Sequence, residues 1–133
     1  MTLEQVQDLI AKLYERTGQG DWDGAAALLT DDFYIIEADD LPFAGRFEGK
    51  NALKDLFTQV MGIWDDPALV LEDVAVSQNN AFGVVKLSAT SKHSGERITM
   101  EIAERFILRD GKVAAIMPYY YDTGLVRRAT GLD

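Results

Sequence analysis

One strand pattern in this sequence carries a carboxylate among apolar side chains. Residues 97–122 are typical of two antiparallel strands, because an Asp-Gly pair between β-branched runs is a strong hairpin signal. Alternate residues of a strand share a face, so Glu104 points to the same side as the apolar residues around it. On the returning strand, Tyr120 and Asp122 share a face. This combination of acids and a tyrosine indicates a pocket in which protons could be transferred.

A second carboxylate, Glu37, ends another apolar run. Segment 33–38 has strand length, and its alternation places Phe33, Ile35 and Glu37 on one face. Burying a lone carboxylate costs several kcal/mol unless the group is paired or protonated. Two acids that face one cavity should raise the pKa of one of them, which suits acid and base roles in proton transfer.

A purely structural interpretation of both acids stays open. Glu104 could pair with an arginine such as Arg46 or Arg97, and Glu37 could tether the loop that follows it. In either case the carboxylate would be compensated, and no chemistry would follow from its position.

The remaining polar and aromatic candidates have simpler interpretations. Tyr14 and Trp64 fall on amphipathic stripes and are expected in the core or the pocket wall, where they could contact a ligand. Tyr119 and Tyr121 have the opposite parity to Tyr120 and are expected to pack in the core or between subunits. The single histidine, His93, lies in a predicted turn and is not expected to act in catalysis.

The elements that must position these residues follow from periodicity and turn signals. Helices are predicted at residues 2–17, 21–30 and 50–64, with Thr2 and Asp21 as N-caps. Strands are predicted at residues 33–38, 68–77, 81–91, 97–108 and 113–122. Residues 39–49 are predicted as an irregular connection, Asn79-Asn80 as a turn, and residues 123–133 as a tail that docks on the domain.

Three helices followed mainly by strands in hairpin succession favour an α+β fold with helices against one face of an antiparallel sheet. A strongly bent sheet closed by helices forms a cone, and Glu37 and Glu104 would meet inside it. Several strands are apolar on both faces, as in Val84 and Val85. We therefore expect a second copy of the chain to cover the outer face of the sheet, giving a homodimer.

Bulk properties narrow the range of functions. With 133 residues the chain is expected to form a single domain over 1–133, and its net charge of −9 argues against nucleic acid as a partner. The absence of cysteine and the single histidine argue against a metal site. No apolar run has the length of a membrane span and no signal peptide is evident, so a cytoplasmic location away from membranes is expected.

Three motifs carry a resemblance to a known family: GDWDGAAALLTDDF, GRFEGKNALKDLF and ERFILRDGKVAAIMPYYYD. In this order and spacing they resemble the nuclear transport factor 2-like superfamily, in its SnoaL-like and ketosteroid isomerase-like branch. The resemblance implies a cone-shaped α+β barrel, in which three N-terminal helices pack on a strongly bent, mostly antiparallel sheet. It also implies a deep apolar pocket and, commonly, a homodimer formed through the sheet.

The resemblance also implies roles for single residues. Glu37 falls where ketosteroid isomerases place the aspartate that moves the proton, and Glu104 falls on the carboxylic acid of their oxyanion hole. Tyr120 and Asp122 match positions at the mouth of the pocket. Both acids are glutamates rather than aspartates, and the oxyanion tyrosine aligns with Leu13 rather than Tyr14, so a steroid isomerase is not expected.

The resulting functional hypothesis is an isomerase, cyclase or lyase that performs acid/base proton transfer on a small apolar carbonyl-type molecule. Glu37 would be the general base, neutral Glu104 would donate to the developing oxyanion, and Tyr120 and Asp122 would orient the substrate. No cofactor is implied. Two alternatives stay open: a non-catalytic binding protein for a small hydrophobic ligand, and a dimerisation domain with a vestigial pocket.

Overall fold

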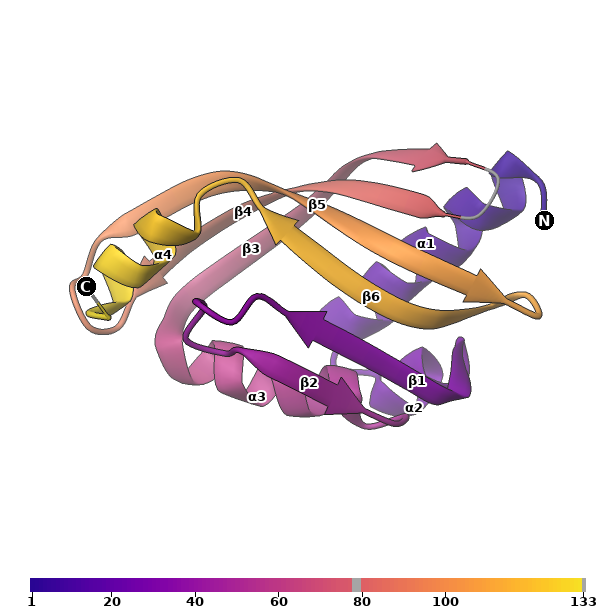
Figure 1. Ribbon diagram of the computed structural model, residues 1–133, viewed down its shortest axis with the longest axis horizontal. Coiled ribbons are helices and arrows are strands. Elements are labelled where there is room, and N and C mark those ends of the chain that lie inside the picture. Colours follow the sequence, from indigo (N-terminus) through magenta and orange to yellow (C-terminus); the bar gives the residue numbers. More distant parts are fainter. Residues whose placement is uncertain (78–79, 133) are drawn as a thin grey trace.

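The computed structural model describes residues 1–77 and 80–132. The first half of the chain forms α1 (Leu3–Gly18), α2 (Trp22–Ala26), β1 (Leu29–Glu37), β2 (Gly45–Glu48) and α3 (Ala52–Ile63). The second half forms β3 (Trp64–Val76), β4 (Ala81–Ser91), β5 (Arg97–Arg109), β6 (Lys112–Tyr120) and α4 (Thr123–Thr130). Figure 1 shows the long, twisted strands of the second half running beside β1 and β2.

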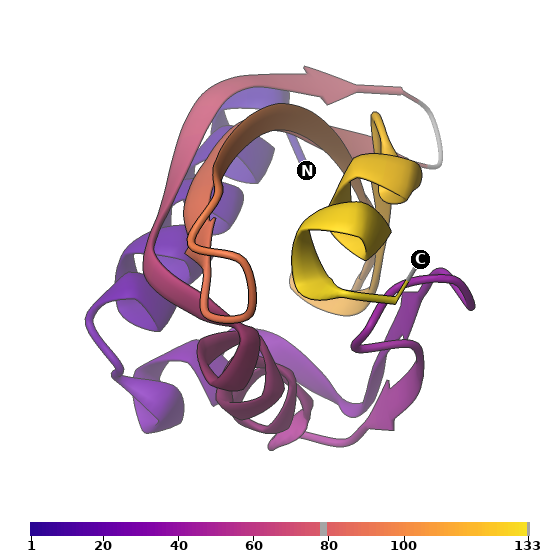
Figure 2. The same cartoon turned by 90° about the vertical axis from the view of Figure 1, so that its left-hand side faces the viewer.

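The strands form one mixed sheet in the order β2-β1-β6-β5-β4-β3. Only β1 and β6 pair in parallel; the other neighbours in the described sheet are antiparallel. Figure 2 shows the strands curving in an arc, with α3 across one side and α4 in the opening. The predicted α+β fold, with helices packed on a strongly bent, mostly antiparallel sheet, is confirmed. The sheet does not close into a complete barrel, because β2 and β3 remain its edges.

The sequence signals at the helix ends operate as predicted. Thr2 forms a capping box with Gln5, in which each side chain bonds the other residue's backbone N–H. The helix ends before Gln19, and the Asp21 side chain then accepts from the Gly24 N–H to begin α2. The buried stripe of α1 is thereby directed at the sheet.

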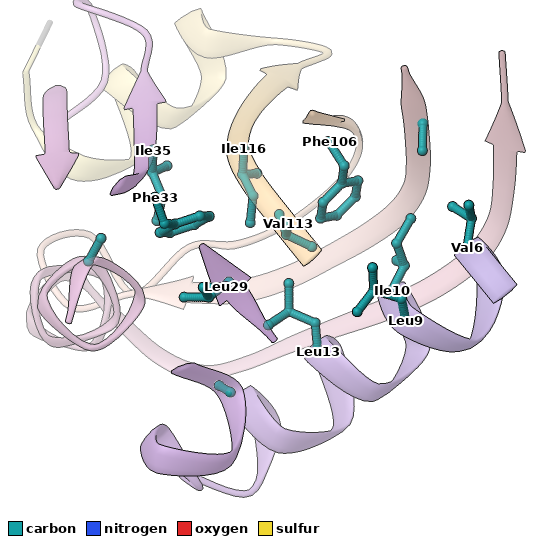
Figure 3. Close-up of a cluster of buried hydrophobic side chains, with 13 residues drawn as sticks. Val6, Leu9, Ile10, Leu13, Leu29, Phe33, Ile35, Phe106, Val113 and Ile116 are labelled. Atoms are coloured by element: carbon teal, nitrogen blue, oxygen red, sulfur yellow. The ribbon is translucent and has the colours of Figure 1, made fainter. Parts of the chain in front are cut away.

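A main core cluster lies between α1 and the concave face of the sheet. Figure 3 shows side chains of α1 facing those of β1, β5 and β6. The labelled members are Val6, Leu9, Ile10, Leu13, Leu29, Phe33, Ile35, Phe106, Val113 and Ile116. The predicted strand parity is therefore confirmed for the residues that precede Glu37 on β1.

Two element boundaries differ from the sequence prediction because pairing in the sheet overrides local preference. β1 begins at Leu29, inside the predicted second helix, since the Leu28 carbonyl accepts from the Val113 N–H and Leu29 pairs with Val113. β3 begins at Trp64, four residues before the predicted strand 68–77, and it continues past Asp66, which has a left-handed conformation, through a register shift between Asp65 and Ala68.

Two further segments contain structure that the sequence analysis did not predict. Residues 45–48 of the predicted irregular connection form β2, which pairs with the end of β1. The predicted docking tail contains α4, which begins at the N-cap Asp122 and ends at Gly131, a glycine with a positive φ. The predicted turn at Asn79-Asn80 falls partly outside the described residues. No helix in the described ranges has the length and apolar character needed to cross a membrane.

Candidate functional site

A cavity of about 400 Å³ opens between the concave face of the sheet, α1 and α3. Its walls are mainly apolar, and its polar lining includes residues from four separate elements. These are Tyr14 of α1, Glu37 of β1, Glu104 of β5 and Tyr120 of β6. A volume of this size suits a small organic ligand. The bent sheet therefore brings the two predicted acids to one chamber.

Glu104 is held by the first helix. The Tyr14 hydroxyl donates a hydrogen bond to Glu104 Oε1, and the Tyr14 ring packs edge-on against Phe106. On the neighbouring strand Gly83 pairs with Glu104, and a Cβ at Gly83 would lie 3.4 Å from the Tyr14 hydroxyl. The same Cβ would lie closer still to the side chains of Phe106, at 3.2 Å, and Leu71, at 3.3 Å, so the glycine allows tight packing beside the Tyr14–Glu104 pair.

Glu37 is more deeply buried and has no such partner. Only 2% of the residue is exposed, and its Oε1 has no hydrogen-bond partner among the described residues. The strand parity of β1 directs Glu37 inward with Phe33 and Ile35. An unpaired carboxyl group in such a site is strongly disfavoured as an anion.

The arginines that could have compensated the acids lie elsewhere. Arg46 pairs with Glu48 at 2.5 Å and stacks over the Tyr34 ring. Arg97 contacts the Asp66 backbone and Thr90. No lysine, arginine or histidine of the described chain lines the cavity. The structural interpretation in which a salt bridge neutralises Glu104 therefore has no support in this geometry.

Burial and mutual repulsion shift the pKa values of the whole group. Burial, reinforced by the charge on Glu104, raises the pKa of Glu37 to about 9. Burial also raises the pKa of Glu104, while the hydrogen bond from Tyr14 acts in the opposite direction. The pKa values of Tyr14 and Tyr120 rise because both phenols are buried near these carboxyl groups. Both tyrosines therefore keep their protons and can donate hydrogen bonds.

Other predicted site residues fall in two groups. Trp64 lines the cavity, and its buried Nε1 has no hydrogen-bond partner within the described chain. Tyr120 lines it too and packs its ring against Phe43 at a centroid distance of 6.0 Å. Asp122 lies apart, because its carboxylate accepts from the Leu125 N–H as the N-cap of α4 and does not line the cavity. We therefore give Asp122 no part in the site.

Two features of the site were not anticipated. Sequence analysis placed Tyr14 in the pocket wall or core without connecting it to Glu104, and it gave Gly83 no role. An isolated glycine within the strand-like run 81–91 was the available signal, since such a glycine often marks a close approach of another group. For metals, no cluster of three or more potential ligands among His, Cys, Asp and Glu occurs in residues 1–77 and 80–132.

Residues 10–116, most of the chain, match the sequence profile of the SnoaL-like domain. The chain belongs to the SnoaL-like domain family. No curated protein matches this SnoaL-like chain significantly.

Solved structures share the SnoaL-like chain's fold at low sequence identity. A nuclear transport factor 2-like protein of unknown function from Burkholderia pseudomallei is 16% identical, with a TM-score of 0.84 over 98% of each chain. A Jannaschia protein assigned to the SnoaL-like polyketide cyclases is 19% identical, with a TM-score of 0.78 over 98% of this chain and 94% of that one. A Catenulispora acidiphila protein with a ketosteroid isomerase-like fold, in complex with trimethylamine, is 9% identical, with a TM-score of 0.76 over 94% and 93%. At these identities the likeness shows the fold alone.

Proposed function

We propose that this SnoaL-like chain is an enzyme that transfers protons on a small, uncharged carbonyl compound, as an isomerase, cyclase or lyase does. The supporting observation is the pair Glu37 and Glu104, which lie in one apolar cavity without a compensating cation from the described lining residues. If Glu37 and Glu104 had only a structural role, we would expect each to pair with a cation or to be replaced by an apolar residue, because buried unpaired carboxyl groups destabilise a fold. Two carboxyl groups with different surroundings in one cavity can instead act as acid and base.

The cavity also limits the class of substrate. A ligand carboxylate or phosphate would approach two carboxyl groups and meet no cation from the described lining, so an anionic ligand is disfavoured. The apolar walls favour a compact hydrocarbon skeleton. The Tyr120 hydroxyl supplies a hydrogen-bond donor for a carbonyl oxygen. An uncharged ketone or ester that fits a volume of about 400 Å³ meets these requirements.

The proposal can be tested before the natural substrate is identified. The protein is incubated in D₂O with a panel of uncharged cyclic ketones such as 2-tetralone, and deuterium incorporation at the α-carbon is followed by NMR. We expect catalysed exchange that falls by roughly 10²- to 10⁴-fold when both glutamates are replaced by glutamine. The matched control is Glu101→Gln, which changes an exposed glutamate of the same strand β5 and should leave exchange unchanged.

The opposite outcome is equally informative. Ketones that raise the melting temperature but exchange no faster than in the double variant would contradict the enzymatic proposal. That result would favour the alternative of a binding protein for a small hydrophobic ligand.

A homodimer through the sheet is the second part of the proposal. On the face opposite the cavity, Val70 is 56% exposed and Tyr119 is 49% exposed, and Val84 lies between them on the same face. Exposed apolar side chains grouped on one sheet face are typical of a subunit interface. A second copy of this chain is the occupant that would bury them.

A further inference from the structure

The carboxyl pair is not symmetric, and its asymmetry assigns the two roles. We propose that Glu104, held by Tyr14, is the base that takes a proton from substrate carbon, and that neutral Glu37 is the acid that supplies a proton to substrate oxygen. The inference rests on the proposed function and deepens it. It reverses the roles that the resemblance to ketosteroid isomerases implies for these two positions.

The first support is the hydrogen bond to Glu104. The Tyr14 O–H points at Glu104 Oε1 and retains its proton in this buried position. A donor directed at a carboxylate oxygen stabilises the ionised form of that group. Glu104 lines the cavity, and its Oε1 accepts from Tyr14. We therefore assign the second oxygen, Oε2, as the atom that takes the proton from a ligand.

The second support is the lack of any donor to Glu37. Its Oε1 is buried and unpartnered in the described structure, and no charged nitrogen of the described lining lies opposite it. Ionisation would leave an uncompensated charge in an apolar site. Neutral Glu37 instead carries an O–H that can donate to a ligand oxygen.

No other charged group among the described lining residues changes the order in which the two glutamates ionise. Of the elements around the cavity, α1 contributes Tyr14 and β6 contributes Tyr120 as the remaining titratable groups. The described lining residues from α3, β3 and β4 are all uncharged. Burial raises the pKa of both glutamates; the charge on Glu104 raises that of Glu37 further, while the Tyr14 hydrogen bond acts in the opposite direction on Glu104. Together with the hydrogen-bond donor that Glu104 has and Glu37 lacks, this favours Glu104 as the group that loses its proton first.

The proposed proton-transfer cycle starts with one proton on the two glutamates, carried by Glu37. Glu104 Oε2 takes the proton from the carbon next to the carbonyl, and the C–H electrons form the C=C bond. The carbonyl π electrons move to oxygen, which takes the proton of Glu37. The enol then returns its O–H proton to Glu37 while Glu104 delivers its proton to carbon, at the original or a conjugated position. The pair ends as it began, and no oxidant or reductant is needed.

This assignment also orients the substrate. Tyr120 lines the same cavity as both glutamates, and its buried phenol keeps its proton. In the proposed complex the carbonyl oxygen accepts hydrogen bonds from the O–H groups of Glu37 and Tyr120. The acidic carbon lies toward Glu104 and α1.

The order of ionisation is measured first, on the protein without ligand. Side-chain carboxyl carbons are labelled with ¹³C in glutamate and titrated by NMR, and the two signals are assigned with Glu37→Gln and Glu104→Gln. We expect Glu104 to titrate at the lower pH. Tyr14→Phe should raise the pKa of Glu104 by about one to two units, as loss of a hydrogen bond to a charged group does. Tyr34→Phe is the matched control, because Tyr34 alternates with the inward-facing Ile35 on β1 and its ring contacts Arg46.

The exchange assay supplies the second readout. Glutamine at position 37 retains an N–H that can donate to a carbonyl oxygen, whereas glutamine at position 104 cannot accept the carbon proton as a base. We therefore expect Glu104→Gln to lose at least ~10-fold more exchange activity than Glu37→Gln. The reverse ranking would overturn the assignment.

The two proposals fail in different ways. If Glu37 ionises before Glu104, or if Tyr14→Phe leaves the Glu104 pKa unchanged, the inverted roles are wrong while catalysis by the pair stands. If the parent protein exchanges the α-hydrogen of no ketone faster than the double variant does, the enzymatic proposal is wrong. The catalytic roles assigned to Glu37 and Glu104 are then wrong as well.

Discussion

The burial of Glu37 lowers the free energy of unfolding of this protein at neutral and alkaline pH. Its pKa rises from 4.5 to about 9 on folding, because the protein buries the carboxyl group near Glu104. The folded state therefore binds a proton that the unfolded state has released. Stability from this group is complete below pH 4.5 and is lost progressively as the pH rises toward about 9.

A glutamine at this position removes the titration, which leads to a prediction. Glu37→Gln should leave stability nearly unchanged at pH 4.5 and raise the free energy of unfolding at pH 8 by on the order of 4 kcal/mol, since one pKa unit corresponds to about 1.4 kcal/mol. Urea unfolding at the two pH values measures the difference. Exposed Glu101→Gln should show no such trend, and a variant no more stable than the parent at pH 8 would mean that Glu37 is ionised in the folded state.

At the scale of elements, hydrogen bonds of one buried hydroxyl connect α4 to the β4–β5 turn. Ser91 is 1% exposed, and its Oγ donates to the Ala129 carbonyl at 2.6 Å. The same oxygen accepts from the backbone N–H groups of His93 and Ser94. Helix α4 in turn packs Val126 into the cluster that contains Trp64, so its docking helps to hold one wall of the cavity.

Removing that hydroxyl leaves several backbone groups without their partner. Ser91→Ala should lower the free energy of unfolding by about 2 kcal/mol and speed amide hydrogen exchange in α4 more than in α1. Ser88→Ala is the matched control, because Ser88 pairs with Thr99 at the exposed face of the same strand. Equal stability of the two variants would show that α4 is held by apolar packing alone.

At the scale of the whole molecule, the open edges and the uncovered sheet face matter most. The sheet leaves β2 and β3 as edges, and the face opposite the cavity exposes apolar side chains such as Val70 and Tyr119. Neither of these two side chains lines the cavity. The open edges and the exposed face are consistent with the proposed homodimer.

We predict that light scattering in solution will give twice the mass of the 14.8 kDa chain. Val70→Lys combined with Tyr119→Lys should convert the dimer to a monomer, since like charges would then face each other across the interface. Leu3→Lys, at an exposed apolar site on α1, serves as the control. A monomeric parent protein would exclude the dimer, and an unchanged mass in the double variant would place the interface on another face.

The sequence by itself determined the elements whose signals are local. The capping box at Thr2, the Asp-Gly hairpin after β5 and the alternation on β1 each depend on neighbouring residues, and the structure has them as predicted. Parity along the strands also placed Glu37 and Glu104 on inward faces. Periodicity contains this information because side-chain direction repeats with the backbone.

The tertiary structure alone decided which inward-facing groups meet. The hydrogen bond from Tyr14 to Glu104 spans 90 residues of sequence and depends on the packing of α1 against the bent sheet. The same bend leaves Glu37 Oε1 buried without a donor among the described residues. Local pattern fixes the face to which a side chain points, but the curvature and packing of distant elements determine its partner. The division of roles between two chemically identical glutamates is therefore a property of the fold.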